Sequence, residues 1–335
     1  MKNRKNILHD KHGRDHTYLR ISLIERCNLR CSYCMPEEGV QLSPKSHLMT
    51  YEEIYEIAKT FVKHGVTKIR LTGGEPLIRK DIPIILEKLA SLPVELSITS
   101  NAVIIDKFID VLKANGVNKI NVSLDSLDSE KFKHVTRRDQ FKKVYNNILL
   151  LVKEGFTVKV NAVLIKNFND NEIIDFINFT KDLPISVRFI EFMPFDGNKW
   201  DISKMVSYQE VMDSVNEAFS KDKIIRLQDA PNDTSKNYKI KGYKGSFGII
   251  SSVTNPFCDS CNRLRLTANG QLKNCLFSST EADILSTLRS GKPFEPVIKK
   301  AVEAKLKVRG GMDTIEKLQE PKLHSNNRSM ITIGG

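Results

Sequence analysis

The chain has 335 residues, a hydrophobic fraction of 40% and a formal net charge of +12 at pH 7. This length is enough for one large α/β domain with an appended segment, and the hydrophobic fraction is enough for a core, so a disordered chain is excluded. No apolar run approaches the roughly 20 residues of a membrane-spanning helix. Residues 1–16 are polar and lack the apolar region of a signal peptide. We therefore predict a cytoplasmic protein that does not insert into a membrane.

The positive charge is compatible with nucleic acid, a membrane surface or a polyanionic small substrate as partner. No dense run of lysine and arginine is present, so we do not expect nucleic-acid binding as the main function.

Strands and helices are predicted to alternate from about residue 18 to residue 219. Apolar and polar residues alternate over 18–24 as in a half-buried strand. Thr50 followed by Glu53 predicts a capping box at the start of a helix over 51–64, and Ser207 is the expected cap of a helix over 208–219. Further strands are expected at 66–71, 94–99, 117–124, 157–164 and 185–192, and further helices at 81–90, 106–115, 141–153 and 169–181.

This alternation predicts an α/β fold with parallel strands and right-handed crossovers. A closed barrel needs eight such units and about 250 residues. Only six units are predicted here, so a partial (six-unit) β/α barrel fits better, with its chemistry at the carboxyl ends of the strands. Beyond residue 220 the sequence becomes charged and rich in turns. We therefore divide the chain into a polar N-terminal leader at 1–17, the barrel at 18–220 and a C-terminal segment at 221–335.

Three cysteines follow the first predicted strand with the spacing C-x3-C-x2-C, namely Cys27, Cys31 and Cys34. Three thiolates on one loop can hold a 4Fe-4S cluster and leave its fourth iron without a protein ligand, so that this iron can bind a small molecule. A structural zinc loop and three buried apolar cysteines are the alternatives. Zinc usually has four protein ligands, and no fourth cysteine or nearby histidine follows, so we favour the cluster.

A second triplet, Cys258, Cys261 and Cys275, accounts for the remaining cysteines. Two sets of three are unusual for disulfides and typical of two metal sites in a reducing compartment. Arg263 and Arg265 lie inside this triplet, two residues apart, which puts both guanidinium groups on one face of a short strand. Guanidinium groups match phosphate oxygens. A base bound at the cluster, with its phosphates held by the arginines, indicates a nucleoside triphosphate.

Several motifs together resemble the GTP 3',8-cyclase family of radical S-adenosylmethionine (SAM) enzymes, over about residues 14–335. They are CNLRCSYCMP, KIRLTGGEP, RFIEFMP, the C-x2-C-x13-C triplet with NRLRL inside it, and the terminal Gly-Gly. The resemblance implies an open barrel of radical SAM type with a C-terminal extension that carries a second iron-sulfur cluster. It also implies a lyase that performs the first step of molybdenum cofactor biosynthesis.

In that family, a 5'-deoxyadenosyl radical made from SAM at the first cluster abstracts hydrogen from the ribose C3' of GTP. The carbon radical then attacks C8 of the guanine, which the second cluster binds. The implied product is (8S)-3',8-cyclo-7,8-dihydroguanosine 5'-triphosphate.

The resemblance also implies roles for individual residues. SAM would contact Tyr33, Gly74, Ser123 and Met193. GTP would contact Arg20, Arg70, Thr99, Lys159, Arg263 and Arg265, with Lys68 and Arg188 as supporting charges. Catalysis would require Arg263, Arg265 and the tail glycines Gly334 and Gly335.

The implied cofactors are two 4Fe-4S clusters and SAM, and the implied substrate is GTP. The implied partners are an electron donor such as flavodoxin or ferredoxin and a downstream cyclic pyranopterin monophosphate synthase. The enzyme is expected to be a monomer or a homodimer.

Two stretches depart from the family pattern. Ala102 occupies a turn position where the family usually has glycine, and residues 222–237 receive no role. Two other functions stay open at this point. One is a radical SAM peptide-modifying enzyme whose second cluster relays electrons, and the other is a zinc-stabilised nucleic-acid-binding protein.

Overall fold

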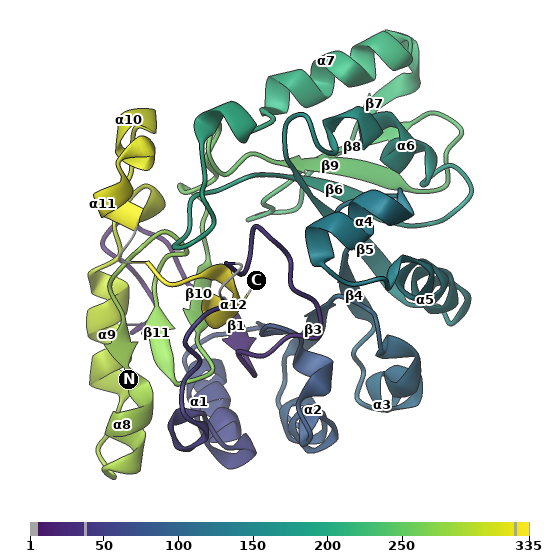
Figure 1. Cartoon of the computed structure of the whole chain (residues 1–335). Coiled ribbons are helices and arrows are strands. Elements are labelled where there is room, and N and C mark those ends of the chain that lie inside the picture. Colours follow the sequence, from purple (N-terminus) through teal and green to yellow (C-terminus); the bar gives the residue numbers. More distant parts are fainter. Residues whose placement is uncertain (1–5, 37–38, 325–326, 335) are drawn as a thin grey trace.

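A curved sheet organises the molecule (Figure 1). The computed structural model describes residues 6–36, 39–324 and 327–334. Within these residues the sheet has the strand order β12-β11-β10-β1-β2-β3-β4-β5-β6-β9-β8-β7. The central strands are parallel and follow chain order. They are β1 (Tyr18–Ser22), β2 (Lys68–Thr72), β3 (Glu95–Ser100), β4 (Lys119–Ser123), β5 (Thr157–Leu164) and β6 (Ser186–Glu191).

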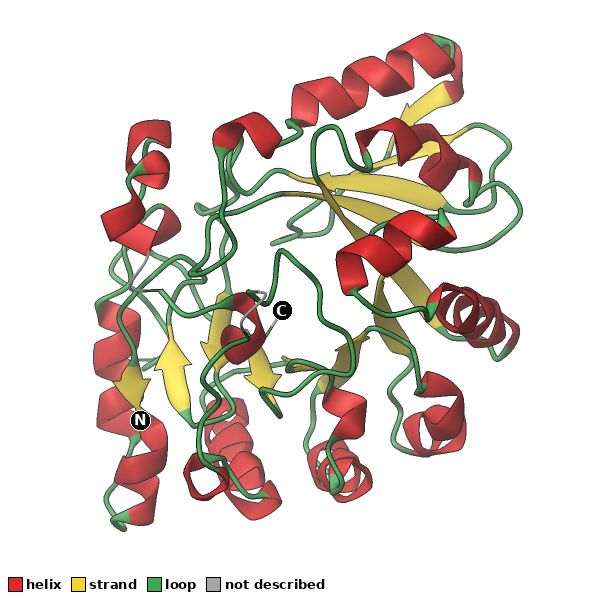
Figure 2. Cartoon of the chain, in the orientation of Figure 1, coloured by secondary structure: helices red, strands yellow, loops and turns green. Residues whose placement is uncertain are grey.

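Helices connect these strands along the outside of the curve (Figure 2). They are α1 (Tyr51–Lys63), α2 (Ile82–Ala90), α3 (Ile109–Ala114), α4 (Ser129–Thr136), α5 (Phe141–Lys153), α6 (Ile173–Asn178) and α7 (Tyr208–Ala218). Side-chain alternation separates the two faces of the sheet. On β1, Leu19 and Ile21 are fully buried in the main core with Phe61 of α1, whereas Arg20 between them remains partly exposed. Polar strand residues therefore face the inside of the curve.

Most of the predicted elements are confirmed. Thr50 and Glu53 form the predicted capping box of α1, and Ser207 caps α7 in the same way. α5 and β5 have the predicted bounds. The helix predicted over 106–115 begins instead as a 3-10 turn, so α3 has only six residues. α4 was not predicted, because a helix of eight residues with so few apolar positions gives a weak periodic signal.

The chain beyond residue 220 extends both edges of the same sheet. β9 pairs in parallel with β6, and β10 pairs in parallel with β1. The added strands are β7 (Ile224–Arg226), β8 (Lys236–Ile240), β9 (Ser246–Ile250), β10 (Arg263–Leu266), β11 (Gln271–Lys273) and β12 (Ala282–Asp283). The added helices are α8 (Ile284–Arg289), α9 (Glu295–Glu303), α10 (Ile315–Gln319), α11 (Pro321–His324) and α12 (Met330–Ile333). In the described ranges, no helix has the length and apolar character needed to cross a membrane.

The N-terminal residues 6–16 are held in place by a buried hydrogen-bond network. Asp10, Arg14 and His16 are buried. Arg14 donates hydrogen bonds to Asp10 (2.7 Å) and to the carbonyl oxygens of Cys258 (2.8 Å) and Lys307 (2.9 Å). Residues 6–16, which the sequence predicts to be part of a polar leader, are therefore bound to the C-terminal region.

Candidate active site

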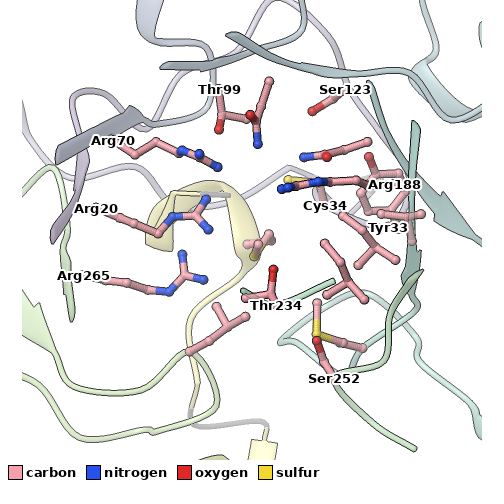
Figure 3. Close-up of a pocket in the computed structure, with 18 of the residues that line it drawn as sticks. Arg20, Tyr33, Cys34, Arg70, Thr99, Ser123, Arg188, Thr234, Ser252 and Arg265 are labelled. Atoms are coloured by element: carbon pink, nitrogen blue, oxygen red, sulfur yellow. The ribbon is translucent and has the colours of Figure 1, made fainter. Parts of the chain in front are cut away.

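All six cysteines line one cavity of about 310 Å³ inside the curve of the sheet. Its wall includes the carboxyl ends of the central strands, the place where this class of fold concentrates catalytic groups. Figure 3 shows side chains from several strands converging on this space. The predicted SAM and GTP residues that line it are Arg20, Tyr33, Arg70, Gly74, Thr99, Ser123, Met193, Arg263 and Arg265.

The first cysteine loop is fixed between β1 and α4. The backbone N–H groups of Arg30 and Ser32 donate to the carbonyl oxygens of Thr136 and Val135, each at 2.9 Å. These bonds satisfy carbonyls at the end of α4 that have no partner inside the helix. The loop is therefore held in one conformation by the helix that sequence reasoning missed.

The thiols of this loop fit a cluster rather than isolated buried cysteines. Cys27, Cys31 and Cys34 are all free. Burial, followed by the charges of Cys27 and Asp125, raises the pKa of the Cys34 thiol to about 12. Thiols that oppose one another's ionisation become thiolates when a metal supplies positive charge. The Tyr33 hydroxyl donates to Asp125 at 2.7 Å, which holds its ring within the cavity wall.

A single-ion site has a different geometry. No three His, Cys, Asp or Glu side chains among residues 6–36, 39–324 and 327–334 lie close enough to hold one metal ion. Zinc keeps each sulfur ligand about 2.3 Å from one ion, whereas the thiolates of a 4Fe-4S cluster bind separate irons.

Gly73-Gly74-Glu75 closes the end of β2 against the first cysteine loop. The N–H of Gly74 donates to the carbonyl of Ile24 (2.7 Å), and that of Glu75 donates to the carbonyl of Arg26 (2.8 Å). A Cβ on Gly74 would lie 2.2 Å from the Arg26 oxygen. Only glycine fits this approach of two backbones.

The Glu75 carboxylate ties the ends of β2 and β3 together. It accepts hydrogen bonds from the N–H groups of Leu77 (3.1 Å) and Asn101 (2.7 Å) and from the Ser100 hydroxyl (2.9 Å). Burial raises the pKa of Glu75 to about 7, although these bonds oppose the shift. The neighbouring Asn101 amide donates to Asn28 of the cysteine loop at 2.6 Å, so the two strand ends and the loop form one unit.

Strand register places three arginines side by side. Arg20 lies opposite Arg265 on β10 and opposite Arg70 on β2. Figure 3 shows the three guanidinium groups projecting into the cavity. No carboxylate in the described part of the chain forms an ion pair with any of them. Burial, followed by the charge of Arg265, lowers the pKa of Arg20 well below its usual value. Such a row of like charges favours an anion in the cavity.

Two further cations lie on β5 and β6. Arg188 on β6 lines the cavity and is buried. Lys159 on β5 is outside the lining residues, but burial and the charges of Arg188 and Arg70 lower its pKa to about 8. Lys68 also lies outside the lining and forms an ion pair with Glu95 at 2.8 Å.

Several buried polar atoms on the cavity wall lack a hydrogen-bond partner in the described residues. They are Arg20 Nε, Thr99 Oγ1, Asn161 Oδ1, Arg188 Nε and Arg263 Nη2. Buried polar groups are rarely left unpaired in folded proteins. Their concentration around one cavity indicates a polar ligand.

The unusual alanine of the turn after β3 does adopt the conformation that glycine would favour. Ala102 has a φ of +60° and is fully buried. The Ser100 hydroxyl accepts a hydrogen bond from its N–H (2.9 Å), and the Asn147 amide donates to its carbonyl (2.6 Å). These contacts hold the turn, and Thr99 keeps its place on the cavity wall.

The second triplet faces the same cavity from the β10 side. As the alternation on β10 predicts, Arg263 and Arg265 both line the cavity. Cys261 accepts a hydrogen bond from the Lys305 ammonium (3.5 Å), and Cys258 accepts one from the backbone N–H of Arg309 (3.4 Å). Burial raises the pKa of Cys258.

The C-terminal tail returns to this centre. Arg265 donates from Nη1 to the carbonyl oxygen of Gly334 at 3.0 Å, and Met330 lines the cavity. Gly335 lies outside the described residues.

Sequence reasoning missed several residues of the site. Thr234 lines the cavity, although the sequence predicts no role for residues 222–237. Arg309 and Asp125 also line it. Asp125 directly follows the predicted strand end at Ser123 and Leu124, and that position could have marked it. Thr234 lies in a loop and Arg309 begins a 3-10 turn (Arg309–Gly311); both are far away in sequence, and neither carries a local signal.

Comparison with known proteins identifies the family. Residues 21–180 match the Radical SAM superfamily, and residues 185–311 match the family described as Molybdenum Cofactor Synthesis C. A protein of Arabidopsis thaliana named GTP 3',8-cyclase, mitochondrial, is 49% identical over 98% of this chain and 84% of its own length. A GTP 3',8-cyclase of Listeria monocytogenes is 41% identical over 98% of this chain and 99% of its own length. The chain belongs to the GTP 3',8-cyclase family. Members of this family carry two 4Fe-4S clusters and use SAM.

Some of the curated relatives are much longer than this chain. The Caenorhabditis elegans molybdenum cofactor biosynthesis protein moc-5 is 47% identical over 95% of this chain. The chain spans 54% of that protein, about half of its length.

Solved structures show the radical SAM α/β fold. Streptococcus suis SuiB bound to SAM has a TM-score of 0.61 at 16% identity, over 90% of this chain and 71% of SuiB. Native anSMEcpe with bound AdoMet has a TM-score of 0.56 at 16% identity, over 94% of this chain and 84% of that protein. Identities this low bear on the fold alone. The family shown by the curated relatives differs from both alternatives left open by the sequence, a radical SAM peptide-modifying enzyme and a zinc-stabilised nucleic-acid-binding protein.

Proposed function

We propose that this chain is a GTP 3',8-cyclase that converts GTP into (8S)-3',8-cyclo-7,8-dihydroguanosine 5'-triphosphate, the first step of molybdenum cofactor biosynthesis. The observation that carries the proposal is that both cysteine triplets line one cavity together with Arg20, Arg70 and Arg265, which are neighbours in the strand register. This arrangement brings a radical-forming centre, a base-binding centre and a phosphate site within reach of one small substrate. Family membership supports the same reaction.

In this proposal the first triplet holds a 4Fe-4S cluster that, with SAM bound, supplies the radical chemistry. The chain's own residues bind and orient the SAM. Gly73 and Gly74 line the cavity beside the cysteine loop, Tyr33 lies in the same wall, and Ser123 and Met193 form the neighbouring part of it. Glu75 keeps the ends of β2 and β3 in register with the loop.

The arginine row would hold the triphosphate. Three adjacent guanidinium groups without carboxylate partners match the several oxygens of a phosphate chain. Arg188 and Lys159 add positive charge from the far side of the cavity. The unpaired Thr99 hydroxyl is placed to bond the same ligand. A phosphate chain fixed in this way leaves the ribose to face the first cysteine loop.

The second triplet would hold a further 4Fe-4S cluster, with one iron open to the guanine. Arg263 and Arg265 line the cavity together with this triplet, and the carbonyl of Gly334 accepts a hydrogen bond from the guanidinium of Arg265. We assign Arg263, Arg265 and Gly334 to the catalytic machinery on this basis, and the terminal Gly-Gly pattern of the family extends the assignment to Gly335.

We further propose that β1–β6 form a partial six-unit barrel spanning residues 18–220, after an N-terminal segment at 1–17. Residues 221–335 are then the extension that carries the second cluster. A flavodoxin or ferredoxin would donate the electron, and a cyclic pyranopterin monophosphate synthase would consume the product. The enzyme would act in the cytoplasm as a monomer or homodimer.

Anaerobic reconstitution tests the proposal. The protein should bind about eight irons, as two four-iron clusters require, and should convert GTP with SAM and dithionite into the cyclised nucleotide and 5'-deoxyadenosine. Cys34→Ala and Cys275→Ala should each lose about four irons and all product. Absence of 5'-deoxyadenosine from the complete mixture, or equal turnover of ATP, would overturn the assignment.

A further inference from the structure

Lys305 is a buried lysine whose ammonium points at a cysteine. Only 2% of its surface is exposed. The ammonium donates hydrogen bonds to the Cys261 sulfur (3.5 Å) and to the carbonyl oxygen of Arg263 (2.9 Å). No carboxylate in the described residues forms an ion pair with it. A buried ammonium is costly without a negative partner, so its counter-charge must come from the sulfur.

The backbone around Lys305 is held by the N-terminal segment. His12 donates from Nε2 to the Lys305 carbonyl at 3.1 Å. Arg14 donates to the carbonyl oxygens of Leu306 (3.1 Å) and Lys307 (2.9 Å). Arg14 is in turn fixed by Asp10. A buried hydrogen-bond network therefore fixes the backbone that carries the ammonium, unlike the backbone of a flexible surface segment.

The two cysteine triplets differ in the groups that donate hydrogen bonds to their sulfurs. Within the described residues, Cys27 of the first triplet accepts from two neutral groups, the N–H of Leu29 (3.4 Å) and the amide of Asn101 (3.5 Å). Cys261 of the second triplet accepts from a cation. Among the described residues, a cationic hydrogen bond to a cysteine sulfur therefore occurs in the second triplet.

We propose that Lys305 is a positioning residue that makes the second cluster easier to reduce and strengthens the hold of its open iron on the purine of the substrate. A cationic hydrogen bond to a thiolate ligand draws electron density from the sulfur, and the iron becomes a better acceptor. This inference rests on the second cluster of the proposed function.

The test isolates that cluster. In a parent variant carrying Cys27→Ala, Cys31→Ala and Cys34→Ala, only the second triplet can hold iron. Lys305→Met, Lys305→Arg and Lys307→Met are made in this parent. Lys307 is exposed and two residues away, so its substitution removes the same charge without touching the sulfur. Iron content, the midpoint potential by redox titration with electron paramagnetic resonance, and the GTP dependence of that spectrum are measured.

Lys305→Met should lower the midpoint potential and weaken the GTP response about tenfold or more, within the range typical for outer-shell metal partners. Lys305→Arg should stay close to the parent, and Lys307→Met should match it. If Lys305→Met binds no iron while Lys305→Arg does, then iron binding itself requires a positive charge at this position, which also supports the inference. An unchanged potential in Lys305→Met, an equal shift in Lys307→Met, or loss of iron from both Lys305 variants would overturn the inference. A parent without a cluster would instead overturn the second cluster itself, and the inference with it.

Discussion

The guanidinium of Arg265 donates a hydrogen bond of 3.0 Å to the carbonyl oxygen of Gly334, across 69 residues of sequence. This contact joins a strand at the edge of the cavity to the last described turn of the chain. Both partners are buried, and the tail follows α12 into the inside of the curve (Figure 1). The tail is therefore a part of the cavity wall.

Substitution of Gly334 by alanine should displace the tail. Gly334 has a φ of +89°, and a Cβ there would lie 2.7 Å from both Ser22 Cβ and Thr72 Oγ1. We expect Gly334→Ala to lose GTP turnover by about tenfold or more, equivalent to about 1.4 kcal/mol, with little change in the melting temperature. Gly291→Ala is the matched control, since Gly291 has a φ of +69° and a Cβ added there would have no other atom within 4 Å. Full activity in Gly334→Ala would contradict a role for the tail.

Removal of one arginine from the row should weaken phosphate binding without destabilising the protein. Arg20 stands between Arg70 and Arg265, so Arg20→Met relieves repulsion in the ligand-free protein. We expect the melting temperature to stay equal or rise, while GTP affinity falls by about 1.5–3 kcal/mol, the value of a hydrogen bond to a charged group. Scanning calorimetry measures the melting temperature, and titration calorimetry with GTP and with guanosine measures the affinity.

Guanosine, which has no phosphate, should bind Arg20→Met and the wild type alike. Lys119→Met serves as the control, because Lys119 is exposed, pairs with Glu95 and does not line the cavity. Equal loss of affinity for both ligands would show that Arg20 does not act through the phosphates.

Local sequence patterns predicted most of the central fold. The alternation on β1 and the capping box at Thr50 depend on residues close in sequence, so they are visible without a structure. The pairing of β10 with β1 joins segments more than 240 residues apart, and no local pattern encodes it. The same holds for the approach of Lys305 to Cys261, which needs the folded N-terminal segment.

The candidate site divides in the same way. The cysteine spacing and the glycine pair at Gly73 are each visible within a short stretch of sequence. The structure brings all of these residues to one cavity. The conformation of Ala102 could be anticipated from the turn it occupies, but the contact with Asn147 that stabilises it could not. The part played by Thr234 depends on how a long loop folds back over the cavity, which the sequence alone does not specify.

Acid should destabilise the protein through His16. Its Nε2 donates to Asp10 at 3.1 Å, and its Nδ1 has no partner in the described residues. Burial, followed by the charge of Lys305, lowers the pKa of His16 to about 3 from an ordinary value of 6.5. Between pH 6.5 and 3 the unfolded chain binds a proton that the folded protein does not, so the stability present above pH 6.5 is lost as the pH falls.

Urea unfolding of the cluster-free protein at pH 7 and pH 5.5 measures this loss. We expect a decrease of about 1 kcal/mol from His16, because one pKa unit corresponds to about 1.4 kcal/mol. His16→Gln should remove this part of the pH dependence, whereas substitution of the exposed His47 by glutamine should leave it unchanged. The same pH dependence in His16→Gln and in the wild type would rule out His16 as its source.

Gly74 tests whether the end of β2 shapes the first cysteine loop. A Cβ at this position would lie 2.2 Å from the Arg26 carbonyl oxygen and 3.1 Å from Cys27 Cβ, and both neighbours are backbone or directly attached to it. Gly74→Ala must therefore push the loop away from β2. The second triplet is anchored elsewhere, by Arg14 and Lys305. We expect iron to fall from about eight to about four per chain, with loss of 5'-deoxyadenosine but retention of the GTP response of the second cluster. Gly65→Ala, at a φ of +111° with no atom within 4 Å, should keep all of its iron. Full iron content in Gly74→Ala would mean that the loop binds its cluster without support from β2.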